Sequence, residues 1–113
     1  MSERLYAMPF NRLYPLYLAK VTKKGRTQAE LDAVIGWFTG YAPAQLHDSP
    51  LSLRDFFAGA QVPPVATAIT GVVCGVRVEA ISDPLLQQIR RLDKLVDELA
   101  RGKALTKIQR VQA

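Results

Sequence analysis

The most regular spacing of hydrophobic and polar positions lies between Asp83 and Gly102. Hydrophobic residues recur there at spacings of four, three, four and three, which is typical of one face of an α-helix. Asp83 is a favourable N-cap, Pro84 fits the first helical position, and Gly102 can adopt the left-handed conformation that ends a helix. The pattern predicts one long C-terminal helix against which the rest of the chain packs. Its apolar stripe consists of Leu85, Ile89, Leu92, Val96 and Leu99.

The opposite face of this helix is charged. Two pairs of opposite charge, Asp97 with Arg101 and Lys94 with Glu98, lie four residues apart. Exposed pairs of this kind stabilise a helix by about 0.3 to 0.5 kcal/mol each, so we expect a solvated face. The apolar stripe allows two interpretations, because it can cover the core of the same domain or form a seam between two copies of the chain.

A first helix is predicted upstream, where four residues share one face and Gly25 provides the end. Pro15 lacks an amide donor and is tolerated only in the first turn, so this helix should begin near Arg12 or Leu13. The shared face consists of Tyr14, Tyr17, Leu18 and Val21.

A second helix follows, beginning with the T-x-x-E capping box of Thr27 and Glu30 and ending at Gly40. Trp37 lies beside its apolar stripe, and we expect it to flank the core. The stripe consists of Leu31, Val34, Ile35 and Phe38.

Three short helical pieces complete the helical prediction. One turn is expected at Ala44 to His47, and a helix at Leu53 to Ala60, where Ser52 and Asp55 offer a second capping pattern. After the long helix, Leu105 and Ile108 mark a last amphipathic piece.

The stretch from Val65 to Ile81 is compatible with two structures. Its valines and threonines favour a strand, whereas Val65, Ile69, Val72 and Val76 fall on one helical face. Because a lone strand has no partner and no other segment resembles one, we predict a buried helix that unwinds near Gly75.

These elements predict an all-α fold, a single compact domain over residues 1–113 with about five helices and a long C-terminal helix. The ends, about 1–9 and 111–113, should be loose. The alternative is an α+β fold in which Val72 to Ile81 is extended.

The composition agrees with one soluble domain, since 49% of the 113 residues are hydrophobic and 22% are charged. Residues 56–76 are uncharged, but prolines and glycines interrupt them, and the apolar part, Val65 to Val76, is too short to span a membrane. The single cysteine and the lack of a recognisable leader make the cytoplasm the expected compartment.

The charge of +5 and the pI near 9.7 permit association with nucleic acid. Two basic clusters fall at expected helix ends, where cations also complement the helix dipole. The first comprises Lys20, Lys23, Lys24 and Arg26, and the second Arg101, Lys103, Lys107 and Arg110.

No catalytic, metal or nucleotide motif is recognisable. The only histidine, His47, lies in a polar loop, and the only cysteine, Cys74, lies in an apolar run that favours an inert core thiol. One His and one Cys cannot supply a zinc site, and no phosphate-binding glycine motif occurs. We therefore predict no cofactor and favour a non-enzymatic protein.

Charged residues next to the glycine-rich segment form the candidate functional surface. Arg77 would need a partner if this segment enters the core, and the long helix offers Asp83, Asp93 or Asp97. A structural ion network is the simpler interpretation, and an anion-binding arginine is the alternative. The candidate surface comprises Arg77, Glu79, Arg90, Asp93 and Asp97.

Three blocks of the chain carry a family resemblance: YPLYLAKVTKKGRTQAELDAVIGWFTGY, ITGVVCGVRVEAISDPLLQQIRRLDKLVDELARGKAL and the closing KIQR. Together they resemble the bacterial family known as domain of unknown function 2200. The resemblance implies a small bacterial protein of one domain, and it assigns no activity, substrate or cofactor to any residue.

The resulting functional hypothesis is a small interaction or scaffold protein that self-associates through its helical faces. The first alternative is a nucleic-acid-associated protein that uses the two basic clusters. The second is a small-molecule or enzymatic site around Arg77.

Overall fold

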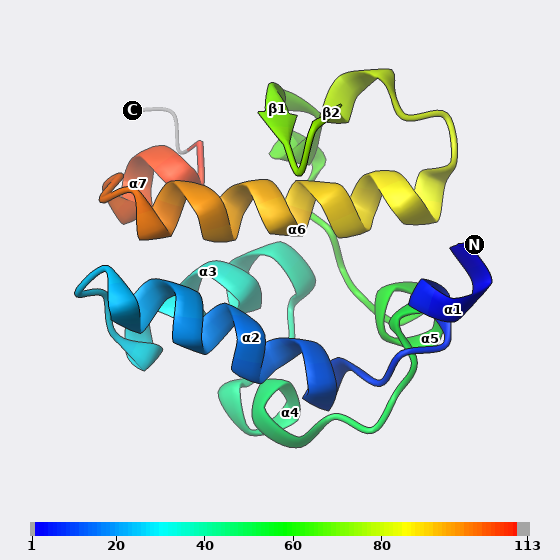
Figure 1. Cartoon of the computed structure of the whole chain (residues 1–113), viewed down its shortest axis with the longest axis horizontal. Coiled ribbons are helices and arrows are strands. Elements are labelled where there is room, and N and C mark those ends of the chain that lie inside the picture. The colour runs from blue at the N-terminus through cyan, green and yellow to red at the C-terminus, as the bar shows by residue number, and fades with distance from the viewer. Residues whose placement is uncertain (1, 111–113) are drawn as a thin grey trace.

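The computed structural model describes residues 2–110. The longest helix, α6 (Pro84–Ala100), crosses the molecule, with a β-hairpin on one side and the helical layer of α2 and α3 on the other (Figure 1). The remaining elements are α1 (Ser2–Tyr6), α2 (Phe10–Lys23), α3 (Gln28–Thr39), α4 (Pro43–Asp48), α5 (Leu53–Ala58), the 3-10 turn η1 (Pro64–Ala68), β1 (Val72–Val73), β2 (Val76–Arg77), the 3-10 turn η2 (Val78–Ala80) and α7 (Leu105–Ile108).

The prediction of a long, capped C-terminal helix is confirmed. The Asp83 carboxylate accepts from the Leu85 amide at 3.0 Å, Pro84 is the first helical residue, and Gly102 has a φ of +94° just past the end. The predicted stripe faces the core, with Leu85 partly buried and its other members buried.

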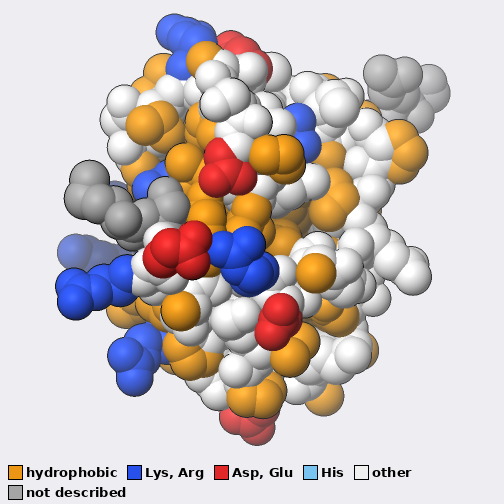
Figure 2. Space-filling model, turned by 90° about the vertical axis from the view of Figure 1, so that its right-hand side faces the viewer, with side chains coloured by type: hydrophobic (Ala, Val, Ile, Leu, Met, Phe, Trp, Pro, Cys, Tyr) orange, Lys and Arg blue, Asp and Glu red, His pale blue; other side chains and the backbone are white. Residues whose placement is uncertain are grey.

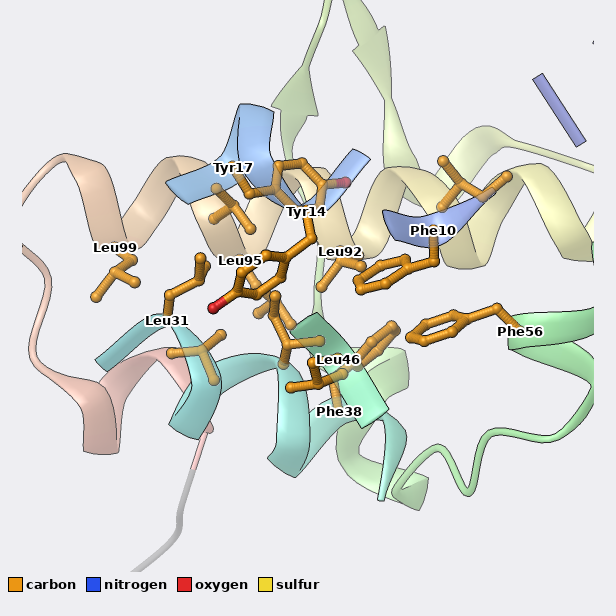
Figure 3. Packing of buried hydrophobic residues seen from close by; sticks show 14 of the residues in the cluster. Phe10, Tyr14, Tyr17, Leu31, Phe38, Leu46, Phe56, Leu92, Leu95 and Leu99 are labelled. Atoms are coloured by element: carbon orange, nitrogen blue, oxygen red, sulfur yellow. The ribbon is translucent and has the colours of Figure 1, made fainter. Parts of the chain in front are cut away.

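The core lies between α6 and the layer of α2 to α5. Leu92, Leu95 and Leu99 of α6 point toward the side chains of α3 and α4 (Figure 3). Phe10 of α2 and Phe56 of α5 stack with ring centroids 3.9 Å apart and planes 4° from parallel. Both rings are almost fully buried, so this stack closes the core beside α5.

The all-α prediction is confirmed, because five helices of the described chain have at least six residues and the only sheet there has two short strands. The Thr27–Glu30 capping box is present, with each side chain accepting from the other residue's amide. Gly40 ends α3 with a φ of +80°. Trp37 is partly buried against the core, as expected of a flanking residue. None of the helices between residues 2 and 110 has the length and apolar character that crossing a bilayer requires.

The predicted start of α2 is wrong by two to three residues. The helix begins at Phe10, so Pro15 is its sixth residue. The Phe10 amide donates to the Leu51 carbonyl, and the Asn11 amide donates to the Ser49 carbonyl, both at 2.8 Å. These distant carbonyls satisfy amides that would otherwise lack partners at the start of a helix.

The N-terminal residues contain one element that the pattern does not predict. Within the first nine residues, expected to be loose, Ser2–Tyr6 forms α1. The Tyr6 hydroxyl donates to the Asp83 carboxylate at 2.5 Å, which attaches α1 to the start of α6. The expectation of a loose end at 111–113 concerns residues outside the described part of the chain.

The predicted helix at Val65 to Ile81 is wrong, and the extended alternative is closer. The chain forms η1 and then an antiparallel hairpin that pairs Val72 with Arg77 and Val73 with Val76. The stretch therefore supplies its own partner strand. Cys74 and Gly75 have φ values of 51° and 77°, and a two-residue type I′ turn requires positive values at both positions.

The hairpin also corrects the expectation of a buried Cys74. Its side chain is exposed, because it occupies the turn rather than a helix face. The apolar residues that Val65 to Ile81 buries are Ala66, Ile69, Val73 and Val78, each at most 6% exposed.

We expect Leu92→Ala to lower the free energy of unfolding by about 2 to 5 kcal/mol, because it leaves a cavity in the core beneath α6. Leu16→Ala is the matched control: Leu16 is 62% exposed, so its truncation should change stability by at most about 0.5 kcal/mol. Urea denaturation of both variants checks this, and equal losses would contradict the assignment of α6 as the core helix.

Candidate functional site

The five residues of the predicted surface separate into three groups. Arg77 and Glu79 pair with each other at 3.4 Å, and Arg77 is 61% exposed. The condition for pairing Arg77 with an aspartate of the long helix, entry of this segment into the core, is not met, because β2 exposes both of its residues. The Glu79 carboxylate accepts a hydrogen bond from the Gly71 amide at 2.9 Å. This bond is the main reason why the pKa of Glu79 is lowered.

Arg90 and Asp93 form the second group, on the side of α6 that meets α2. The Asp93 carboxylate accepts from the Tyr17 hydroxyl at 2.5 Å and from the Arg90 guanidinium at 2.8 Å. The Cys74 thiol lies 3.9 Å from the same carboxylate. The pKa of Tyr17 is raised well above its usual value, mainly by burial and next by the charge of Asp93. The hydroxyl therefore stays protonated and donates. This network joins α2, α6 and the hairpin.

Asp97 belongs to a third group, at the end of α6. It pairs with Lys20 of α2 at 3.3 Å and with Arg101 at 2.8 Å, the latter as the sequence predicts. The other predicted pair, Lys94 with Glu98, is absent from the ion pairs of residues 2–110. Lys94 donates instead to the Val72 carbonyl at 3.2 Å and so holds the hairpin on α6.

Glu98 corrects the expectation of a solvated charged face. Its side chain is 7% exposed and pairs with Arg110 at 2.7 Å and with Lys103 at 3.5 Å. The chain turns back after Gly102 and places α7 against α3 and α6, with Ile108 fully buried. Glu98 therefore anchors the C-terminal turn, which a helical-wheel pattern cannot reveal.

The two basic clusters of the sequence meet at one end of the molecule, where α2 and α6 end and α7 lies (Figure 1). The Arg26 guanidinium donates to the Lys103 carbonyl at 3.2 Å, which joins the two clusters directly. We call this surface the basic end. It comprises Lys20, Lys23, Lys24, Arg26, Arg101, Lys103, Lys107 and Arg110, together with the acidic residues Glu30, Asp97 and Glu98.

The basic end carries the whole net charge of the chain. It holds eight of the fifteen basic residues and three of the ten acidic ones, so the remaining seven of each sign cancel and the charge of +5 lies here. Lys23, Lys24 and Lys107 are exposed and make no ion pair within residues 2–110. Figure 2 shows the opposite side of the molecule, where acidic and basic side chains stand next to one another.

A second cluster, which the sequence does not predict, surrounds Asp32 of α3. Its carboxylate accepts from the Tyr14 hydroxyl of α2 at 2.5 Å and contacts His47 Nε2 of α4 at 2.8 Å. Burial, followed by the hydrogen bond to Asp32, raises the pKa of Tyr14 to about 12. These residues are 15 and 18 positions from Asp32, so no local spacing indicates the cluster.

Five surface hollows on the described part of the chain all lie away from residues 71–79. Two of them flank Arg101 at the basic end, one lined by Lys20 and Lys24 and the other by Lys103 and Lys107. Another lies beside Asp32. Among the described residues, no three His, Cys, Asp or Glu side chains gather as a metal site would require.

Comparison with known proteins gives one family and one solved structure. Residues 4–110 match the model of an uncharacterised protein family conserved in bacteria, DUF2200, as the three sequence blocks predict. The chain is similar to a crystal structure of the uncharacterised protein SP1917, with 44% identity and a TM-score of 0.88 over 97% of this chain and 93% of that chain. No curated protein matches.

The Tyr14–Asp32 bond predicts a stability loss at alkaline pH. The folded chain keeps the Tyr14 proton up to about pH 12, whereas the unfolded chain releases it near the ordinary tyrosine pKa of 10.0. The contribution is therefore complete below about pH 10 and is lost as the pH rises toward about 12. We expect the difference in free energy of unfolding between the wild type and Tyr14→Phe to shrink across this interval, and a constant difference would contradict this.

Proposed function

The chain belongs to the bacterial DUF2200 family, and we propose that it is a small non-enzymatic binding protein whose basic end contacts the phosphate backbone of nucleic acid. The observation that carries the proposal is the union of two basic clusters, far apart in sequence, on one surface that holds the entire net charge. The C-terminal dipoles of α2 and α6 offset only about half a charge each.

The distribution of these cations favours nucleic acid over a lipid surface. The exposed residues between them, Thr22, Gly25, Gly102, Ala104 and Thr106, have no large hydrophobic side chain, so they offer little apolar surface for insertion into a bilayer. Within residues 2–110, the large exposed hydrophobic side chains are Leu16, Leu51, Val72 and Val76, none of which belongs to the basic end.

The same distribution favours binding that does not depend on base sequence. The cations come from the ends of α2, α6 and α7 and the loops beside them, rather than from one face of a recognition helix. Such an arrangement suits phosphate contacts, whose affinity falls steeply with salt because counterions are released.

The test is fluorescence anisotropy with labelled single-stranded and double-stranded oligonucleotides over a range of salt concentrations. At physiological salt we expect dissociation constants of about 1 to 100 µM, and tighter binding at about 50 mM salt. Lys23→Gln combined with Lys24→Gln should reduce the slope of log K against log salt by about 2, since each lost phosphate contact removes about 1.

The matched control is Arg4→Gln combined with Arg12→Gln, which removes the same charge from exposed residues outside the basic end. This control should retain the wild-type slope. Equal effects of the two double variants would show that binding depends on net charge alone and not on the basic end. A chain that binds neither oligonucleotide at about 50 mM salt would refute the proposal.

Self-association is a second candidate, favoured by the hairpin. Val72 and Val76 are 51% and 38% exposed, and the outer edges of β1 and β2 pair with no other strand of residues 2–110. A second copy of the chain could cover such edges by strand addition.

Light scattering at high protein concentration should then give a dimer mass, and Val76→Lys should return it to the monomer mass. Leu16→Lys adds the same charge at an exposed position on α2, outside the hairpin, and should leave the dimer intact. A wild type that is strictly monomeric at high concentration would exclude self-association.

A further inference from the structure

We propose that the hollow beside Asp32 binds a cationic nitrogen group, an ammonium or guanidinium, and that Asp32 is its counter-ion. The hollow has a volume of about 420 Å³ and lies on the exposed side of α3. Asp32, Trp37 and Tyr41 line it together with the small residues Ala29, Ala33 and Gly36. The inference rests on Asp32 and this hollow, and it does not depend on nucleic-acid binding.

The charge balance of Asp32 is the first argument. Its side chain is 11% exposed, and its hydrogen-bond partners are the Tyr14 hydroxyl and the His47 imidazole, which is charged only when it is protonated. No lysine or arginine of residues 2–110 pairs with it. A partly buried carboxylate without a permanently charged partner attracts a cation more strongly than one in bulk water does.

The other carboxylates of low exposure are balanced within the chain. Asp93 pairs with Arg90, and the side chains of Asp97 and Glu98, 18% and 7% exposed, each pair with two cations. Asp32 therefore departs from the pattern that the rest of the molecule follows. The hollow beside it has room to admit a permanently charged group.

The lining indicates the kind of cation. The small residues Ala29, Ala33 and Gly36 line the hollow, and Gly36 lets the Tyr41 carbonyl approach, because a Cβ there would lie 3.1 Å from that oxygen. The Trp37 indole can attract an organic cation through its ring, whereas a hard metal ion needs several oxygen ligands and finds a single carboxylate here. An alkylammonium or alkylguanidinium group fits a hollow lined by one carboxylate, a tryptophan and small residues.

Trp37 makes the site directly measurable, because it is the only tryptophan of the chain. Titration with butylammonium chloride at constant ionic strength should change its fluorescence with saturation, at a dissociation constant of about 1 mM. The uncharged analogue butanol should give no saturating change. An unchanged signal with butylammonium up to concentrations far above this value would overturn the proposal.

Substitutions separate the charge from the shape of the hollow. Asp32→Asn should weaken butylammonium binding about tenfold, whereas Asp48→Asn, the same change at an exposed position on α4 outside the hollow, should leave it unaltered. His47→Lys would supply an internal counter-ion and should abolish binding, and His47→Gln should preserve it. Wild-type affinity in both Asp32→Asn and His47→Lys would overturn the proposal.

Ala33→Leu is a second test of the hollow, which remains informative if the Asp32→Asn variant fails to fold. Ala33 is exposed on α3, so a leucine there fills the hollow without entering the core. Circular dichroism should show an intact fold, and butylammonium binding should be lost. Retained binding in this variant would overturn the assignment of the hollow.

The source of the cation is distinguished by a second ligand. The peptide acetyl-Gly-Lys-Gly-amide presents the same ammonium group within a chain. An affinity at least about tenfold above that of butylammonium supports a lysine of a partner protein, whereas equal affinities support a free amine. Either result upholds the site, and failure of both ligands to bind overturns it.

Discussion

The burial of one face of α6 is the constraint on which the rest of the structure depends. A helix of 17 residues with a continuous apolar stripe cannot remain in water, and α2, α3, α5 and α7 each cover part of it. The hairpin lies over the remaining side, where Val73 and Val78 are buried. Each element is therefore placed by the portion of α6 that it covers.

The polar face of α6 is almost as constrained as the apolar one. Asp93 accepts a hydrogen bond from Tyr17 of α2. Asp97 forms an ion pair with Lys20 of α2, and Glu98 forms one with Arg110 beyond α7. Partly buried hydrogen bonds to a carboxylate contribute more than exposed ion pairs do, because less water competes for them. These bonds fix the ends of α2 and α7 relative to α6, and thereby bring the two basic clusters onto one surface.

The sequence predicts the parts of this structure that depend on local spacing. Helix periodicity, the Thr27–Glu30 capping box and the Asp83–Pro84 start concern neighbouring residues, and the structure confirms them. It does not predict features that need a distant partner. The start of α2 depends on carbonyls of Ser49 and Leu51, and the pairing of the hairpin overrides a helical spacing of valines.

The candidate site shows the same limit. The basic clusters are visible in the sequence, but their union requires α2 and α6 to run parallel, so that both helices end at the same side of the molecule. Burial of Glu98 and exposure of Arg77 reverse the expectation from their spacing, because a chain reversal covers one and a hairpin exposes the other. The Asp32 cluster joins three helices and has no local signature at all.

The central claim is that the basic end is the surface that meets nucleic acid. The most direct measurement is the mapping of backbone amide chemical shifts in the labelled protein during titration with an oligonucleotide at low salt. The account predicts shifts concentrated in residues 20–26 and 101–110, with the hairpin and the hollow beside Asp32 unaffected. Shifts centred on the hairpin or on α3, or none at all, would contradict it.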